Sequence, residues 1–250
     1  MLKKNVESVL RQIAASDRVL DIGGWAKPFN RANYVIDIMP YETRGYFGSD
    51  GPATECFSRD TWIRHDISSK EPLPFGDKAI DYVVCSHALE DIRDPIHVCA
   101  EIIRVGKKGY IEVPSRTMES IMGLRGKHFA GYYHHRWLIE INGSEITFRF
   151  KPHLLHNSWK LHFPRSYLRK LSEEDQVSYL FWENTFQYEE LIQISHLKVA
   201  HELEEFVRRK RVYPSLFYSI DSLVEKFLGR KDDLSAHESF WLNTPEIHSK

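Results

Sequence analysis

The sequence lacks any long uninterrupted run of apolar residues. No stretch approaches the roughly 18 apolar residues of a membrane-spanning helix, and residues 1–7 (MLKKNVE) carry no apolar core of a signal peptide. Cysteine is scarce as well. Cys56, Cys85 and Cys99 form no C-x-x-C pair, and their odd number does not suit a disulfide framework. We therefore expect a cytoplasmic protein without membrane association, whose cysteines are structural.

A strong charge of either sign is also missing. The 34 basic and 35 acidic side chains leave a formal net charge of −1, which gives no long-range attraction to nucleic acid. The main basic run, residues 208–211, closes a predicted helix, where cations complement the helix dipole. We therefore expect no nucleic-acid partner.

What the sequence does contain, over residues 1–116, is an alternation of strands and helices. A helical period over residues 2–15 predicts an amphipathic helix. Pro95 opens a second helix, which ends at Gly106. Between the first two strands there is room only for the stub of a helix. Buried strands are predicted at residues 18–22, 34–38, 62–67, 80–85 and 109–113. This alternation predicts an α/β fold with a Rossmann-like, mostly parallel sheet flanked by helices.

The second part of the chain begins with a hairpin signal. The Asn142-Gly143 step lies between two alternating segments within residues 136–150, and we expect this hairpin to form the antiparallel edge of the sheet. Beyond Pro164 the spacing of apolar residues favours helices. We therefore expect a cofactor-binding domain over residues 1–150 and a mainly helical extension over 151–250. The extension would cap a pocket or bind a partner, and a homodimer through these C-terminal helices remains open.

The most informative feature is residues 19–24 (VLDIGG), followed by residues 35–38 (VIDI). A glycine turn after a buried strand lets a ligand approach the backbone, and the acid Asp37 at the end of the next strand can accept ribose hydroxyls. This arrangement predicts a nucleoside site. A dinucleotide site would need G-x-G-x-x-G, whereas this turn continues into Trp25 and Pro28. A nicotinamide dehydrogenase is therefore disfavoured.

These residues resemble the class I S-adenosylmethionine-dependent methyltransferases, within them the type 11 group, over about residues 15–116. Residues 19–24 look like the first motif of that family, residues 65–67 (HDI) like its adenine-binding step, and residues 81–90 (DYVVCSHALE) like its fourth-strand signature. The resemblance implies S-adenosylmethionine as the cofactor. It implies ten cofactor-binding residues: Asp21, Gly23, Gly24, Trp25, Asp37, Ile38, Asp66, Ile67, Ser86 and His87.

The acids among these residues have distinct expected roles. A carboxylate at Asp21 is favourable near the sulfonium and ammonium groups of the cofactor, and Asp37 would accept charge-assisted hydrogen bonds from the ribose. The resemblance places the adenine amino group at Asp66 and a ring nitrogen at the backbone amide of Ile67.

Ser86, His87 and Trp25 bear on whether the protein is an active methyltransferase or only a binding protein. Ser86 and His87 are expected near the methionine part and the reacting methyl group. Trp25 stands where the family usually has a third glycine, and it either packs over the cofactor or narrows the pocket. We therefore expect a methyltransferase, and we keep as the alternative a catalytically inactive binding or scaffold protein with a methyltransferase fold.

Histidines and aromatic residues in 132–137 (YYHHRW) suggest an acceptor site. If the acceptor is a hydroxyl, His134 or His135 can remove its proton, and because neighbouring residues on a strand face opposite ways, only one of the two is expected to do so. We expect O-methylation of a small-molecule or glycan-like acceptor. His153 and His156 lack an acidic or cysteine partner at a diagnostic spacing, so no metal site is expected.

Overall fold

The computed structural model describes residues 1–210, 220 and 223. The chain divides into two compact units. Unit 1 comprises Met1–Pro114, Ile139–Phe148 and Val177–Leu191, and unit 2 comprises Ser115–Leu138, Arg149–Gln176 and Ile192–Lys250. Apart from positions 220 and 223, the predicted helical extension beyond residue 210 lies outside the described residues. Among the described residues, no helix has both the length and the apolar character needed to span a bilayer.

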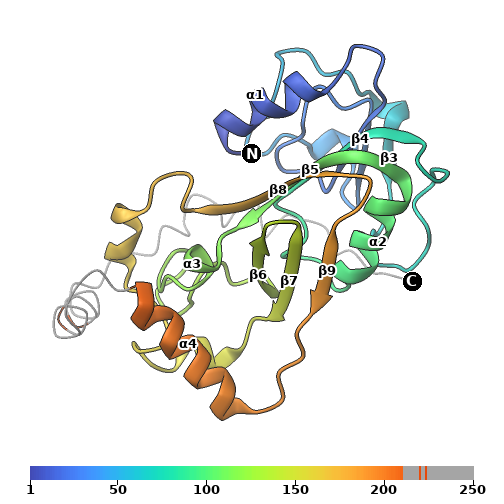
Figure 1. The fold of residues 1–250 in the computed structure, drawn as a ribbon. Coiled ribbons are helices and arrows are strands. Elements are labelled where there is room, and N and C mark those ends of the chain that lie inside the picture. Colours follow the sequence, from blue (N-terminus) through green and yellow to red (C-terminus); the bar gives the residue numbers. More distant parts are fainter. Residues whose placement is uncertain (211–219, 221–222, 224–250) are drawn as a thin grey trace. The chain divides into compact units, whose positions relative to one another are not determined.

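Unit 1 is built on a six-stranded sheet (Figure 1). Its strands are β1 (Val19–Ile22), β2 (Tyr34–Asp37), β3 (Trp62–Arg64), β4 (Ile80–Ser86), β5 (Gly106–Pro114) and β8 (Val177–Glu183). Their order is β3-β2-β1-β4-β5-β8, with the first five parallel and β8 antiparallel to β5. The predicted fold class, a mostly parallel α/β sheet, is confirmed.

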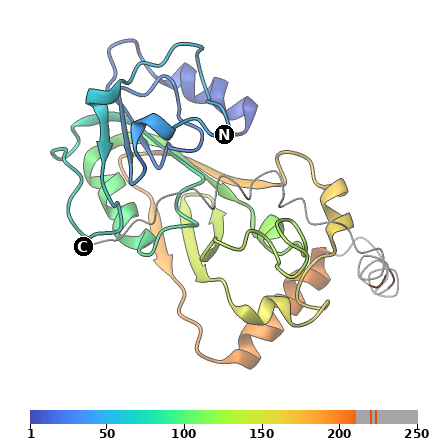
Figure 2. The same cartoon turned by 180° about the vertical axis from the view of Figure 1, so that it is seen from behind.

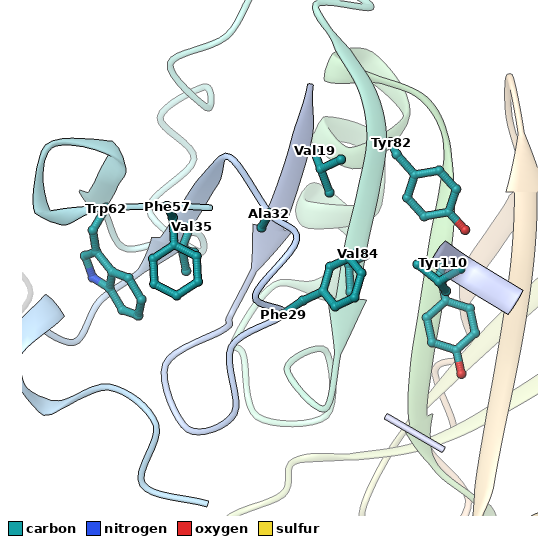
Figure 3. Packing of buried hydrophobic residues seen from close by; sticks show 10 residues of the cluster. Val19, Phe29, Ala32, Val35, Phe57, Trp62, Tyr82, Val84 and Tyr110 are labelled. Atoms are coloured by element: carbon teal, nitrogen blue, oxygen red, sulfur yellow. The ribbon is translucent and has the colours of Figure 1, made fainter. Parts of the chain in front are cut away.

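Helices flank this sheet, and its central strands are therefore buried on both faces. Along each strand, alternate side chains point to opposite faces. On one face Val19, Tyr82 and Tyr110 pack with Val9 of α1 (Lys3–Gln12) (Figure 3). On the other face α2 (Pro95–Val105) contacts β5, and its Cys99 lies close to Cys85 of β4.

The caps of α2 agree with the sequence. The Asp94 carboxylate accepts the backbone N–H of His97 at 2.9 Å, and Pro95 occupies the first turn, where its missing N–H leaves no hydrogen bond unmade. The helix ends at Gly106, as predicted.

The predicted stub of a helix between β1 and β2 is wrong. The chain there forms bends and a turn, and it pairs with the long connection that follows β2. Gly45 donates its backbone N–H to the Trp25 carbonyl at 2.9 Å, and Phe47 donates to Ala26 at 2.8 Å. Pro28 has no N–H to donate within a helical turn. The backbone carbonyls of Trp25 and Ala26 instead accept hydrogen bonds from the loop after β2.

The Asn142-Gly143 hairpin is present, but its predicted place is wrong. Its strands β6 (Trp137–Asn142) and β7 (Glu145–Phe150) form a separate three-stranded sheet with β9 (Gln187–Glu190). The antiparallel edge next to β5 is β8, in a stretch predicted to be helical. Leu180 and Trp182 are buried there and their neighbours are less so, which is the period of two of a strand.

Unit 2 contains α3 (Arg116–Glu119) and α4 (His196–Lys210) (Figure 2). The predicted helical character is therefore confirmed over α4. Its buried residues pack into two small apolar clusters: Val207 with Met118, Ile121, Phe163 and Tyr167, and Leu203 with Ala130, Leu138, Leu155 and Leu161.

Candidate functional site

The carboxyl ends of β1 and β4 meet at a tight glycine turn in unit 1. Gly23 has a positive φ of 75° and donates its N–H to the Ile36 carbonyl of β2 at 2.8 Å. A Cβ at this position would collide with the methyl group of Ala88, in the loop after β4. A glycine is therefore required both for the conformation and for the close approach of these two segments.

Asp21 lies directly beneath this turn. Its side chain is buried, one carboxylate oxygen accepts the N–H of Phe29 at 2.8 Å, and a Cβ on Gly24 would overlap that same oxygen. Desolvation raises the pKa of Asp21 to about 7, although the hydrogen bond from Phe29 acts in the opposite direction. Burial thus disfavours the ionised form of Asp21. A cation bound nearby would stabilise that ionised form.

Asp37, at the end of β2, has both carboxylate oxygens engaged by the backbone. One accepts the N–H of Trp25 at 3.0 Å and the other accepts the N–H of Met39 at 2.9 Å. Desolvation outweighs these bonds and raises the pKa of Asp37 to about 6. Because a carboxylate offers about four lone-pair sites, each oxygen retains capacity for a ribose hydroxyl. The next residue, Ile38, accepts from the Arg64 side chain through its carbonyl at 3.0 Å.

Trp25 anchors the loop that follows β2. Its indole N–H donates to the carbonyl and the hydroxyl of Thr43, each at 2.9 Å. The ring also stacks on Tyr46, with centroids 6.5 Å apart and planes at 11°. This residue, which stands in place of a third glycine, therefore orders residues 41–47 beside the glycine turn.

Asp66 has protein partners for both of its carboxylate oxygens. One accepts the N–H of Ser68 at 2.9 Å, and the other pairs with the Arg93 guanidinium at 2.8 Å. An adenine amino group would share this carboxylate with Arg93. The following residue, Ile67, is buried.

The end of β4 brings together the polar groups of Ser86 and His87. The Ser86 hydroxyl is buried and has no hydrogen-bond partner within the described part of the chain. His87 has a positive φ of 54°, and its ring lies between Glu112 of β5, at 3.1 Å, and Glu90, at 3.4 Å. Desolvation lowers the pKa of His87, but hydrogen bonds to the two carboxylates and their charges outweigh it and raise the pKa to about 9.

Sequence reasoning did not identify Glu90 or Glu112. Both side chains are buried. Glu112 accepts the backbone N–H of Leu2, which joins the start of α1 to β5, and the hydroxyl of Tyr110 within β5. The signal that could have revealed it is a glutamate inside the apolar strand at residues 109–113 (GYIEV), since a buried carboxylate needs partners.

The two candidate histidines of unit 2 differ in their surroundings. His135 Nδ1 lies 2.7 Å from a carboxylate oxygen of buried Glu119, whose other oxygen accepts from Lys151 at 2.6 Å. Although desolvation opposes it, these partners lower the pKa of Glu119. His134 is exposed and packs edge-on against His135. Sequence reasoning found the histidines but neither Glu119 nor Lys151, which lies 32 residues from Glu119.

The strand order of unit 1, with a glycine turn after β1 and an acid at the end of β2, is that of the class I S-adenosylmethionine-dependent methyltransferase fold. The chain belongs to the MetW family: the family model described as "Methionine biosynthesis protein MetW" matches residues 3–167. No match was found among curated proteins.

Solved structures that match part of this chain include three methyltransferases. One is the putative methyltransferase in the complex with the Haloferax volcanii Trm112 activator, with 22% identity, 44% of this chain and 50% of that chain covered, and a TM-score of 0.33. The Mesorhizobium loti S-adenosylmethionine-dependent enzyme has 16% identity, with 59% and 62% covered and a TM-score of 0.35. An Aquifex aeolicus enzyme has 15% identity, with 45% and 65% covered and a TM-score of 0.30. The matches thus span less than two thirds of each structure.

Proposed function

We propose that unit 1 binds S-adenosylmethionine and that the protein transfers the methyl group to a hydroxyl of a small-molecule or glycan-like acceptor. The observation that carries the proposal is the pair of desolvated acids, Asp21 and Asp37, at adjacent strand ends beside a glycine turn. A ligand with positive charge and ribose hydroxyls satisfies both acids. When bound, S-adenosylmethionine supplies an electrophilic methyl group on its sulfonium.

In this proposal, each residue at the strand ends binds a different part of the cofactor. Asp37 holds the ribose, and Asp66 with the backbone of Ile67 faces the adenine ring. The Ser86 hydroxyl, buried without a described partner, donates to the methionine part. Asp21 provides negative charge near the ammonium and sulfonium groups.

His135 is the proposed general base. Because Nδ1 donates to Glu119, the basic lone pair lies on Nε2. Nε2 would accept the proton of the acceptor hydroxyl, whose oxygen would take the methyl group. S-adenosylmethionine would supply that methyl group, and its sulfur would keep the electron pair of the carbon–sulfur bond. His134 is exposed and packs edge-on against His135, which makes it the weaker candidate.

Two measurements test this proposal. Titration calorimetry with S-adenosylmethionine and S-adenosylhomocysteine should show saturable binding, and the absence of binding up to millimolar ligand would contradict it. Transfer of a labelled methyl group to a panel of hydroxyl acceptors should then be lost in His135→Gln and retained in the neighbouring control His134→Gln. Equal turnover in both variants and the wild type would remove His135 as the base.

A second candidate is a binding protein that holds the cofactor or a related nucleoside without catalysis. Two observations favour it: backbone N–H groups already engage both oxygens of Asp37, and bends and a turn replace the helix expected after β1. This candidate predicts saturable cofactor binding but no methyl transfer to any acceptor in the panel.

A further inference from the structure

His87 occupies an unusual position at the end of β4. Its backbone adopts a left-handed conformation, with φ at 54°, which is uncommon for residues other than glycine. Its N–H donates to the Glu112 carbonyl at 2.8 Å. This conformation directs the ring between the Glu112 and Glu90 carboxylates, at 3.1 and 3.4 Å, while 43% of the side chain stays exposed.

The surrounding polar groups are not all satisfied within the protein. The second oxygen of Glu90 is buried and has no hydrogen-bond partner among the described residues, and the same holds for the Ser86 hydroxyl. Glu90 is only 1% exposed. Buried polar atoms without partners are rare in native proteins, so two of them within five residues point to a ligand at this strand end.

We propose that His87 is a specificity-determining residue that distinguishes the sulfonium cofactor from its neutral thioether product by releasing a proton. When a sulfonium binds beside Ser86, the imidazolium of His87 loses its proton to solvent. Glu90 and Glu112 then become the counter-charges of the sulfonium. This inference rests on the proposed function, since it requires S-adenosylmethionine to bind at the carboxyl ends of β1 and β4.

The groups that face His87 support this exchange of charge. Glu90 follows β4, and Glu112 comes from β5. Glu112 has two further polar neighbours. The Tyr110 hydroxyl donates to its carboxylate, and the amino group of Met1, next to α1, lies 3.7 Å from Glu112 Oε1. The described neighbourhood therefore holds the two carboxylates, the imidazolium between them and, next to Glu112, the amino group of Met1. A further cation that enters beside Ser86 competes with the imidazolium for the two carboxylates.

The expected size of the effect follows from Coulomb's law. A unit positive charge at about 5 Å in a partly buried site lowers the pKa of an imidazolium by about two units. The two carboxylates set the pKa of His87 at about 9 before binding, so binding brings it to about 7. At pH 8 the site then releases about 0.8 protons per sulfonium bound, the difference between the protonated fractions before and after binding. A neutral thioether leaves His87 charged.

The experiment is titration calorimetry at pH 8 in two buffers of different ionisation enthalpy, which together give the number of protons released. Wild type is compared with His87→Asn, since asparagine tolerates a positive φ. His153→Asn, an exposed histidine of unit 2, is the matched control. With S-adenosylmethionine, wild type and the control should each release about 0.8 protons more than His87→Asn. With S-adenosylhomocysteine, the three proteins should not differ.

Proton release that is the same in wild type and His87→Asn would overturn the inference and leave the proposed function intact. Absence of binding in wild type would instead contradict the proposed function. Should His87→Asn not fold, an NMR titration of the His87 ring in wild type gives the same answer. The midpoint should fall by about two pH units with S-adenosylmethionine, and an unchanged midpoint would refute the inference.

Discussion

Replacing Asp21 by asparagine should stabilise the cofactor-free protein above pH 7. Asp21 is only 3% exposed, and its pKa rises from 3.8 to about 7, mainly through desolvation. A carboxyl whose pKa is raised by folding binds its proton more tightly in the folded state. Its ionisation therefore costs stability as the pH rises from about 4 to 7, and the cost persists above pH 7.

The magnitude follows from this shift. A difference of about three pKa units corresponds to about 4 kcal/mol at 1.36 kcal/mol per unit. The amide oxygen of asparagine can still accept from Phe29, but its NH₂ group needs an acceptor, and a buried donor without one costs about 1–3 kcal/mol. The expected net gain in unfolding free energy for Asp21→Asn at pH 8 is therefore about 1–3 kcal/mol. The loss of negative charge should also weaken S-adenosylmethionine binding.

Urea denaturation between pH 4 and pH 8 measures the effect. The stability of the wild type should fall relative to Asp21→Asn over this range. Asp81→Asn is a control of opposite sign, because hydrogen bonds from Lys107 and Arg18 lower the pKa of Asp81 and its ionised form is stabilising. If Asp21→Asn is less stable than the wild type at pH 8, and the difference between them does not change with pH, the assignment of Asp21 as a buried acid with a raised pKa is wrong.

Two further changes test the geometry of the turn and of the buried acid in unit 2. Gly23→Ala should cost about 2–4 kcal/mol, from the positive φ and the collision with the Ala88 methyl group. Gly143→Ala has a similar φ and open space, so it should cost only about 1–2 kcal/mol; equal losses in urea denaturation would contradict the close packing of the turn. Glu119→Gln should cost about 3–5 kcal/mol because it removes the buried carboxylate that pairs with Lys151. Adding Lys151→Met should recover part of that loss in thermal unfolding, and no recovery would argue against the ion pair.

The central parallel strands could be predicted because local sequence is sufficient to identify them. Residues 19–22 and 80–85 are nearly continuous apolar runs, which are typical of strands buried on both faces. The start of α2 was equally clear, since Asp94 and Pro95 supply a cap and a first-turn proline. In these segments, propensity, pattern and capping all favour the same structure.

The strand β8 was missed because its partner is distant in sequence. Lys108 of β5 pairs with Glu183 of β8, and no local pattern specifies such a pairing. Apolar residues farther along, including Phe186 and Leu191, gave the segment a helical appearance. The alternation of Leu180 and Trp182 was the available signal.

The site was predictable to a different extent. The positions of Asp21 and Asp37 could be predicted because both acids lie at the carboxyl ends of predicted parallel strands, and those ends meet at one edge of the sheet. The carboxylates Glu112 and Glu119 were not predictable as partners of His87 and His135, since each pair forms only through tertiary packing. Trp25 likewise gave no indication from sequence that its indole would bind Thr43 in the loop after β2.

The most direct test of the central claim is titration of S-adenosylmethionine into the wild type and Asp37→Ala. The account predicts one saturable site in the wild type. Asp37→Ala should bind at least about 10- to 100-fold more weakly, because the loss of even one charge-assisted hydrogen bond to a ribose hydroxyl costs about 1.5–3 kcal/mol. No binding to the wild type up to millimolar ligand, or equal affinity in the two proteins, would contradict it.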